Sequence, residues 1–170
     1  MKVVQKKVCL LGDFAVGKTS LVRRFVVGRF EDKYLSTIGV KVSRKSLERE
    51  DYKLNLLIWD LVGGNEFSRA ETGYLVGTAG ALVVCDLTRP DTLEAVRRYT
   101  SQIRAVNPHV HLVFLGNKID RTEERAIDDD TLTAVATELN APIFLTSAKT
   151  GENVEAAFAH LAELFEGGNS

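Results

Sequence analysis

Short apolar runs alternate with amphipathic stretches along the whole chain. Nearly unbroken apolar segments at 81–84 and 111–115 have the form of strands that are covered on both faces. Between them, apolar residues at helical spacing predict a helix that begins near Asp91 and stops at Pro108. This alternation is typical of a mostly parallel sheet with helices on both faces.

The same pattern predicts the remaining elements. Two extended segments joined by a charged turn are expected to pair as an antiparallel hairpin. Further strands are expected at 8–11 and 142–146, hairpin strands at 40–48 and 53–60, and helices at 18–27, 128–139 and 153–165. The sheet would then have about six strands, all but one of them parallel. No repeat, linker or low-complexity segment interrupts the chain, which predicts a single domain over residues 1–170.

The composition restricts the partners and the setting. With 45% hydrophobic residues, 26% charged residues and a net charge of −1, the chain resembles a soluble globular protein. No basic excess exists to neutralise a nucleic acid strand. Cys9 and Cys85 lie in apolar runs and are expected to be buried thiols, which favours a cytoplasmic location. No apolar run approaches the ~20 residues of a membrane span, and the last residues hold no cysteine for a lipid anchor. We expect an unanchored monomer.

The segment GDFAVGKT, from Gly12 to Thr19, fits the pattern GxxxxGK[ST] between a strand and a helix. Its glycines let the backbone curl so that successive N–H groups point at an anion, and the helix adds its positive dipole end. Lys18 is expected to reach the outer phosphates, and the Thr19 hydroxyl is expected to ligate Mg²⁺. The segment predicts a nucleoside triphosphate and leaves the base open, so an ATP-using enzyme is an alternative at this point.

The segment NKID, from Asn117 to Asp120, directly follows a predicted buried strand. Together with the phosphate loop it resembles the small GTPases of the Ras superfamily, nearest to the Rab type, in which this segment reads guanine. A carboxylate at Asp120 would accept two N–H bonds from guanine, whereas adenine offers a mismatched edge. Residues 147–149, SAK, resemble the second base loop of the family. The resemblance extends over about 6–165 and implies the three-layer α/β fold of P-loop NTPases.

The resemblance also implies a first switch segment at 34–40, YLSTIGV. In that family, the residue at the position of Thr37 gives its hydroxyl oxygen to Mg²⁺ and its N–H to the third phosphate. Tyr34 corresponds to a residue that folds over the phosphates, and Phe30 to an aromatic residue that packs against the base. These contacts exist only with a triphosphate bound, so their loss would release the segment.

A second switch segment is implied at 59–67, WDLVGGNEF. By resemblance, Asp60 holds Mg²⁺ through water and the N–H of Gly63 contacts the third phosphate. Gly64 stands where the family typically has a glutamine that orients the attacking water, and glycine offers no such amide. A catalytic group of this kind is worth about 10²–10³ in rate. Phe14 stands where a small residue is usual and would crowd an arginine supplied by an activating partner.

These features predict a molecular switch that binds GTP or GDP with Mg²⁺ and hydrolyses GTP slowly. Two alternatives stay open, a GTP-locked scaffold without useful turnover and a switch whose activating partner inserts its own glutamine. Effectors, activating partners and exchange factors are expected to contact the first switch and residues 61–75. The predicted catalytic residues are Lys18, Thr37, Gly63 and Gly64; the metal ligands are Thr19, Thr37 and Asp60; and the nucleotide-binding residues are Asp13, Phe14, Ala15, Val16, Gly17, Lys18, Thr19, Ser20, Phe30, Tyr34, Thr37, Gly63, Asn117, Lys118, Asp120, Ser147, Ala148 and Lys149.

Overall fold

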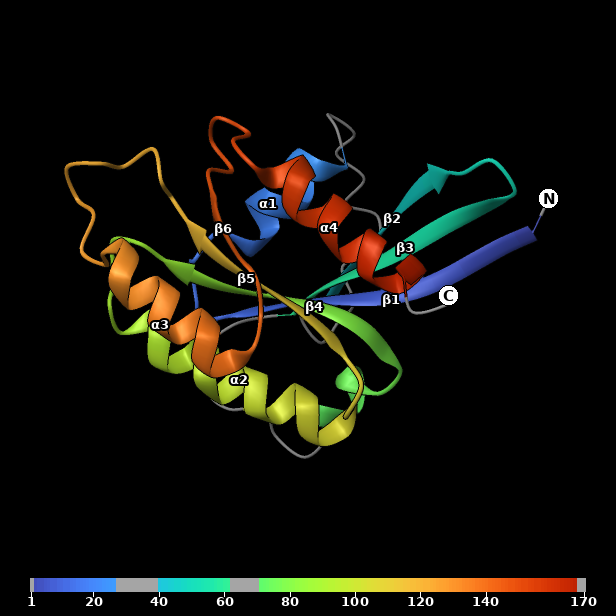
Figure 1. Ribbon diagram of the computed structural model, residues 1–170, viewed down its shortest axis with the longest axis horizontal. Helices are drawn as coiled ribbons and strands as arrows, with labels where there is room; N and C mark the ends of the chain where they lie inside the picture. Colours follow the sequence, from blue (N-terminus) through green and yellow to red (C-terminus); the bar gives the residue numbers. More distant parts are fainter. Residues whose placement is uncertain (1, 27–39, 62–70, 168–170) are drawn as a thin grey trace.

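The computed structural model describes residues 2–26, 40–61 and 71–167. Within these ranges, six strands form one sheet in the order β2-β3-β1-β4-β5-β6, and every neighbouring pair is parallel except β2 with β3 (Figure 1). The strands are β1 (Lys2–Gly12), β2 (Val40–Glu48), β3 (Tyr52–Leu61), β4 (Thr78–Asp86), β5 (His111–Asn117) and β6 (Ile143–Thr146). The helices are α1 (Lys18–Phe25), a short 3₁₀ helix η1 (Glu71–Leu75), α2 (Thr92–Val106), α3 (Asp129–Leu139) and α4 (Val154–Gly167).

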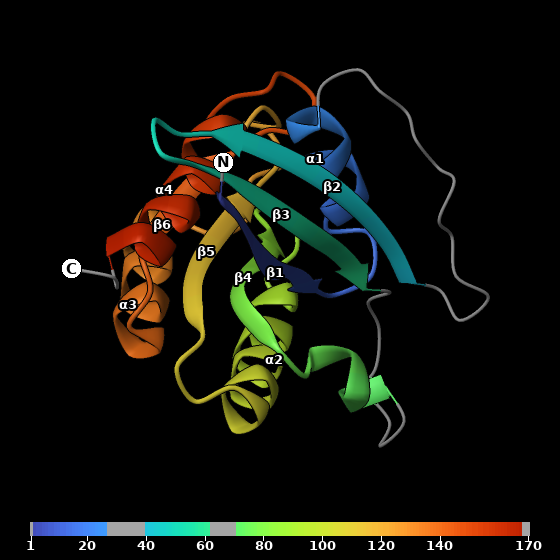
Figure 2. The ribbon, with the colours of Figure 1, turned by 90° about the vertical axis from the view of Figure 1, so that its right-hand side faces the viewer.

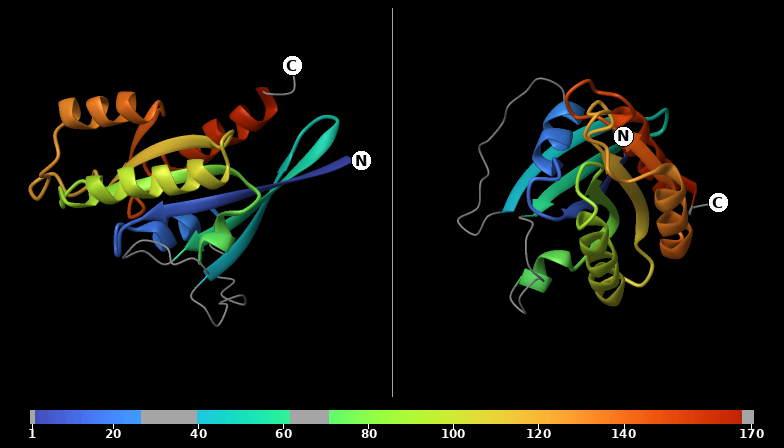
Figure 3. Two further views of the ribbon diagram at one scale, coloured as in Figure 1. Left: turned by 90° about the horizontal axis from the view of Figure 1, so that it is seen from below. Right: turned by 90° about the vertical axis from the view of Figure 1, so that its left-hand side faces the viewer.

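Helices cover both faces of the sheet and make three layers. α1 and α4 lie on one face, and α2 and α3 lie on the other (Figures 1 and 2). Figure 3 shows α2 and α3 beside each other, where Arg97 of α2 pairs with Glu138 of α3 at 2.7 Å. In the described ranges, no helix combines the length and apolarity needed to cross a bilayer. The expected α/β architecture with helices on both faces is confirmed.

The strand pleat divides the apolar side chains between two cores. On β4, Leu82 and Val84 join the core under α1 and α4, whereas Val83 and Cys85 join the core under α2 and α3. Successive side chains of a strand point to opposite faces, so a strand between two helix layers must be apolar at nearly every position. The continuous apolar run predicted this strand for that reason. Cys85 of β4 and Cys9 of β1 are both free and buried, as expected.

Several boundaries differ from the sequence predictions. β1 starts at Lys2 rather than residue 8, because its polar first half pairs with β3 from the register Lys2↔Tyr52 onward. The predicted helix near Asp91 begins at Thr92, and the Asp91 side chain makes no capping hydrogen bond. Asp128 does cap α3, since its carboxylate accepts a hydrogen bond of 2.8 Å from the N–H of Thr131. Strand ends and helix starts lack an apolar signal, which explains these shifts.

The outer end of the β2–β3 hairpin is tied to α4. Arg49 donates two hydrogen bonds of 3.0 Å to the Glu166 carboxylate, and the Tyr52 hydroxyl donates to the same carboxylate. The pair is half exposed, so its main effect is to fix geometry rather than to add much stability. β2 itself forms one edge of the described sheet, with β3 as its paired neighbour.

The stack of Phe25 on Phe158 gives a test of the core under α1 and α4. The two rings are buried, parallel and 3.9 Å apart between centroids. Phe158→Ala is expected to lower the free energy of unfolding by about 3–5 kcal/mol, because it leaves a cavity between α1 and α4. Urea unfolding measures this, with the half-exposed Val3→Ala as a control that should change stability by less than ~0.5 kcal/mol. Equal losses in both variants would contradict this packing.

Candidate nucleotide-binding site

The phosphate loop connects β1 to α1 where the carboxyl ends of the parallel strands meet (Figure 1). Two of its residues have positive φ, Ala15 at 62° and Gly17 at 106°. A Cβ on Gly17 would lie 2.3 Å from the Asn117 side-chain nitrogen, and a Cβ on Gly12 would lie 2.5 Å from the Val84 carbonyl oxygen. Both glycines are therefore required by close approach, and Gly17 also by its backbone conformation.

Side chains from two other loops hold the phosphate loop from outside. Three successive carbonyl oxygens accept hydrogen bonds, Phe14 O from Arg89 at 2.9 Å, Ala15 O from Lys118 at 3.1 Å and Val16 O from Asn117 at 2.9 Å. The carbonyl and the N–H of one peptide group point in opposite directions. Fixing these carbonyls outward therefore turns the next N–H groups, those of residues 15, 16 and 17, toward the inside of the loop, as an anion site requires.

Lys18 supplies a nearly buried cation to the same loop. Its ammonium donates to the carbonyl oxygens of Gly12 at 3.0 Å and Asp13 at 3.1 Å. Burial lowers the pKa of Lys18, while the charges of Asp60 and Asp13 act in the opposite direction. A bound polyphosphate would supply the anionic partner that a desolvated ammonium needs. The position of Lys18 fits its predicted role.

Two of the predicted metal ligands meet at the start of α1. The Thr19 hydroxyl donates a hydrogen bond to the carboxylate of Asp60, which lies near the end of β3. Burial raises the pKa of Asp60, and the Thr19 hydrogen bond and the Lys18 charge oppose that rise. Among the described residues, no group of three or more His, Cys, Asp or Glu residues gathers as a metal site. Two oxygen ligands that leave room for phosphate oxygens and water are a donor set that fits Mg²⁺.

A cavity of about 610 Å³ lies beside the phosphate loop, a volume within the usual range for a small-molecule site. Its lining includes Gly17 and Ser20 from the phosphate loop and α1, Asp120 from the loop after β5, and Ala148 and Lys149 from the loop after β6. The structure thus brings the two predicted base loops and the phosphate loop around one cavity.

Hydrogen bonds join the two base loops. The Ser147 hydroxyl donates to Oδ1 of Asp120 at 2.8 Å and accepts a hydrogen bond of 3.0 Å from the N–H of Thr150. The N–H of Ile119 donates to the Thr146 carbonyl oxygen at 3.0 Å. Ser147 is fully buried, so its side chain orients Asp120 within the protein.

Asn117 links these loops to the phosphate loop. Its side-chain nitrogen donates to Val16 O, and its side-chain oxygen accepts a hydrogen bond of 3.0 Å from the Thr146 hydroxyl. Asn117 is 1% exposed. Its two hydrogen bonds therefore give it a structural role, which is to hold the loop after β6 against the phosphate loop. The prediction that Asn117 and Ser147 contact the nucleotide stays a prediction.

Asp86 supports the site, although no motif in the sequence predicted a role for it. It ends β4, is fully buried, and lies 2.9 Å from the Lys118 ammonium; it also accepts hydrogen bonds from the Thr88 N–H at 2.9 Å and hydroxyl at 2.7 Å. Burial alone would raise the pKa of Asp86, but the hydrogen bonds from Lys118 and Thr88 outweigh it and hold the pKa below its ordinary value. Asp86 therefore positions Lys118 against the phosphate loop.

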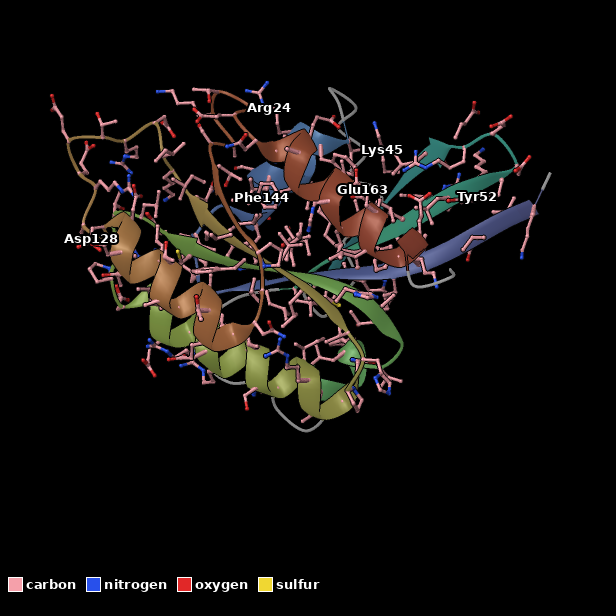
Figure 4. The ribbon with its side chains drawn as sticks, in the orientation of Figure 1. Arg24, Lys45, Tyr52, Asp128, Phe144 and Glu163 are labelled. Atoms are coloured by element: carbon pink, nitrogen blue, oxygen red, sulfur yellow. The ribbon has the colours of Figure 1, made fainter. Side chains whose placement is uncertain are left out.

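Arg24 supports the second base loop from α1. Its guanidinium donates to the carbonyl oxygen of Ala148 at 3.1 Å and also to that of Lys149 (Figure 4). Nothing in the sequence pattern distinguishes Arg24 from a solvated helix residue, because its partners lie more than 120 positions away.

Five predicted site residues, Phe30, Tyr34, Thr37, Gly63 and Gly64, lie outside the described residues. Phe14 is described, and its side chain is 69% exposed. Its ring does not fill the loop, and its N–H is satisfied by Oδ1 of Asp13 at 2.8 Å. The described part of the site therefore consists of the phosphate loop, Asp60 and the two base loops.

A strand–GDFAVGKT–helix unit at the carboxyl edge of a parallel sheet, with NKID beside it, defines a nucleotide-binding protein of the P-loop class. A family model described as the Ras family matches residues 7–166. The chain belongs to this family and is a Rab-like member of the Ras superfamily of small GTPases. The resemblance stated from the motifs is thus confirmed.

Several curated proteins of this kind are similar to the chain over most of its length. Ras-related protein Rab-1C of Dictyostelium discoideum is 37% identical over 157 residues, which cover 92% of the chain and 78% of that protein. Ras-related protein RABD2a of Arabidopsis thaliana is 37% identical over 153 residues, or 89% and 75%. GTP-binding protein YPTM1 of Zea mays is 37% identical over 153 residues, or 89% and 74%. Family membership places the chain among GTP-binding switches.

Asp86→Asn tests the support of the phosphate loop by Lys118. Removing the charge leaves a half-buried ammonium without its partner, so the free energy of unfolding should fall by about 2–3 kcal/mol. Because the pKa of Asp86 is lowered in the folded protein, its contribution is present above the usual aspartate pKa and is lost as the pH falls through the folded pKa. The difference between wild type and variant should narrow at acid pH, as measured by urea unfolding.

The matched control for this prediction is Asp51→Asn, which removes one carboxylate from the exposed hairpin turn. Its effect on unfolding should stay within ~0.5 kcal/mol. A stability difference for Asp86→Asn that did not change with pH would contradict the role given to its charge.

Proposed function

We propose that this chain binds GTP and GDP with Mg²⁺ and that it hydrolyses GTP to GDP and phosphate slowly. One observation carries the binding half of this proposal. Arg89, Lys118 and Asn117 hold the carbonyl oxygens of residues 14–16 in the phosphate loop, and Gly17, the next residue of that loop, lines the same cavity of about 610 Å³ as Asp120. A loop of inward N–H groups suits a polyphosphate, and a carboxylate oriented by Ser147 suits the N–H edge of guanine.

Each part of the site has a distinct task in this proposal. Lys18 balances the charge of the outer phosphates, and the loop N–H groups hold them. Thr19 and Asp60 would hold Mg²⁺, with Thr37 completing the set from the first switch. When bound, the metal would neutralise charge that develops on the phosphate oxygens. Asp120 selects the base, with Lys118 and residues 147–149 around it.

The slow hydrolysis rests on two residues at the phosphate end. Gly64 has no side chain to orient an attacking water, and the loss of such a group lowers a rate by about 10²–10³. The exposed Phe14 side chain stands in the loop where an arginine from an activating partner would approach, and such an arginine contributes about 10³–10⁵. Both changes reduce turnover without removing a predicted contact to phosphate, metal or base.

The surface that reports the nucleotide state is proposed to be residues 34–40 and 61–75. Effectors, exchange factors and activating partners would share this surface, so that only one of them binds at a time. We propose that the protein is a cytoplasmic monomer. It is not expected to bind nucleic acid, because the net charge of −1 leaves no basic excess to neutralise the phosphates of a strand.

The second candidate function is a GTP-locked scaffold, in which the nucleotide serves structure and partner docking. Gly64 and Phe14 favour it, since both lower turnover. Single-turnover hydrolysis of preloaded GTP separates the candidates. Decay within hours supports a switch, and persistence over days supports a scaffold.

Asp120→Asn tests base recognition. An amide cannot accept both N–H bonds of guanine, so the affinity for GDP should fall by about a hundredfold or more. Xanthine carries a carbonyl where guanine carries its amine, so the amide N–H₂ of the variant should improve the affinity for XDP. Isothermal titration with GDP and XDP measures both. Glu124→Gln, which removes an exposed carboxylate 3.7 Å from Arg121, is the control and should bind GDP like the wild type.

The failure of the wild type to bind GDP in this titration would overturn the proposed function itself. Equal GDP affinity in Asp120→Asn and wild type would instead move base recognition to another residue.

Gly64→Gln tests the missing amide. The substitution should raise the single-turnover hydrolysis rate, by up to about 10²–10³ if the rest of the site is competent. Gly64→Ala is the matched control, because it restricts the backbone in the same way and supplies no amide. Equal rates for the two variants would show that the amide does not limit turnover.

A further inference from the structure

Arg89, in the turn between β4 and α2, reaches the phosphate loop across 75 positions of sequence. Its Nη1 donates to Phe14 O at 2.9 Å, and its Nη2 lies 3.7 Å from Oδ2 of Asp13. The guanidinium thus contacts two consecutive residues of the loop with two different nitrogens. A planar fork of this kind fixes direction as well as distance, which a single ammonium cannot do.

The turn that carries Arg89 is held rigidly. The N–H of Arg89 donates to Asp86 O at 2.9 Å, and its carbonyl oxygen accepts from the N–H of Thr92 at 3.1 Å and from the Thr92 hydroxyl at 2.7 Å. Thr92 is fully buried at the start of α2. The backbone of Arg89 is therefore anchored to β4 and α2, and its side chain extends from a fixed point.

Asp13 and Arg89 together hold both polar backbone groups of Phe14. Oδ1 of Asp13 accepts from the Phe14 N–H at 2.8 Å, and Arg89 holds the Phe14 carbonyl. Because that carbonyl is fixed outward, the N–H of Ala15 in the same peptide group points inward. Ala15 has a positive φ, which a residue with a Cβ adopts only when its surroundings hold it there.

The ion pair has a second, electrostatic effect. Asp13 is the acidic residue inside the GDFAVGKT segment, and its carboxylate would repel a bound polyphosphate. Arg89 lies close enough to offset that charge, and the two side chains are only partly exposed, which limits screening by solvent.

We propose that Arg89 is a positioning residue for nucleotide binding, which holds the Ala15 N–H toward the phosphates and neutralises Asp13. The role rests on the proposed function, since it requires a phosphate-bearing ligand in the loop. Arg89 is therefore expected to slow the release of bound nucleotide, although it lies outside the GDFAVGKT and NKID motifs.

Release of a fluorescent GDP analogue from the Mg²⁺-loaded full chain tests this role. Arg89→Ala should release the analogue about tenfold faster, because one charge-assisted hydrogen bond and one ion pair are lost. Arg89→Lys should recover part of the loss, to about threefold, because an ammonium can reach one of the two partners. Arg97→Ala is the matched control. It removes an equally charged residue that pairs with Glu94 and Glu138 away from the loop, and its release rate should equal that of the wild type.

Two further measurements separate positioning from a general loss of structure. The tenfold ratio should persist when excess EDTA removes Mg²⁺, since Arg89 acts on a loop amide and on Asp13. In an Asp13→Asn background, which keeps the acceptor for the Phe14 N–H, Arg89→Ala should accelerate release by only about threefold, because there is no longer a charge to neutralise.

The proposal is overturned if Arg89→Ala and Arg97→Ala release the analogue equally fast, or if the ratio disappears in EDTA. It is also overturned if Arg89→Ala leaves release unchanged but slows single-turnover hydrolysis, which would make Arg89 a catalytic residue. If the wild type binds no GDP, the proposed function is refuted. If the wild type binds GDP but Arg89→Ala releases the analogue at the wild-type rate, only this inference is refuted.

Discussion

The rest of the site depends on the hydrogen bonds that side chains of other loops donate to the carbonyl oxygens of the phosphate loop. A curled backbone with converging N–H dipoles is electrostatically unfavourable without an anion, so other parts of the protein must maintain it. Here Arg89, Lys118 and Asn117 each bind one of three successive carbonyls. They come from the ends of β4 and β5, which follow β1 in the sheet order. The parallel sheet therefore places the donors where the loop needs them.

The same contacts make phosphate binding and base recognition parts of one network. Asn117 holds Val16 on one side and Thr146 on the other. Thr146 is followed by Ser147, whose hydroxyl orients Asp120. A displacement of the loop after β6 would thus move both the Asp120 carboxylate, which is proposed to bind the base, and the phosphate-loop N–H groups, which are proposed to bind the phosphates. Buried hydrogen-bond networks of this kind favour one arrangement, since a partly broken network leaves polar groups unpaired.

The sequence predicted the parts of the site in which neighbouring residues share one task. GDFAVGKT and NKID are contiguous because one loop must wrap one ligand group, and the apolar runs predicted the strands that carry them. Arg24, Asp86 and Arg89 could not be predicted in this way, because each is a single polar residue whose partners are distant in sequence. The β1 start at Lys2 was missed because backbone pairing, rather than apolar side chains, extends the strand. The roles given to Thr37, Gly63 and Gly64 stay predictions.

The position of β2 at the edge of the described sheet has a consequence for self-association. An edge strand presents backbone N–H and C=O groups that a strand of another copy could pair with, which is how many sheets begin to aggregate. Lys41, Arg44 and Lys45 lie within this strand, so two copies aligned edge to edge would bring positive charges together. The opposite edge, β6, has only four residues and offers little length for such pairing. Charge at one border and brevity at the other discourage the sheet from growing between molecules.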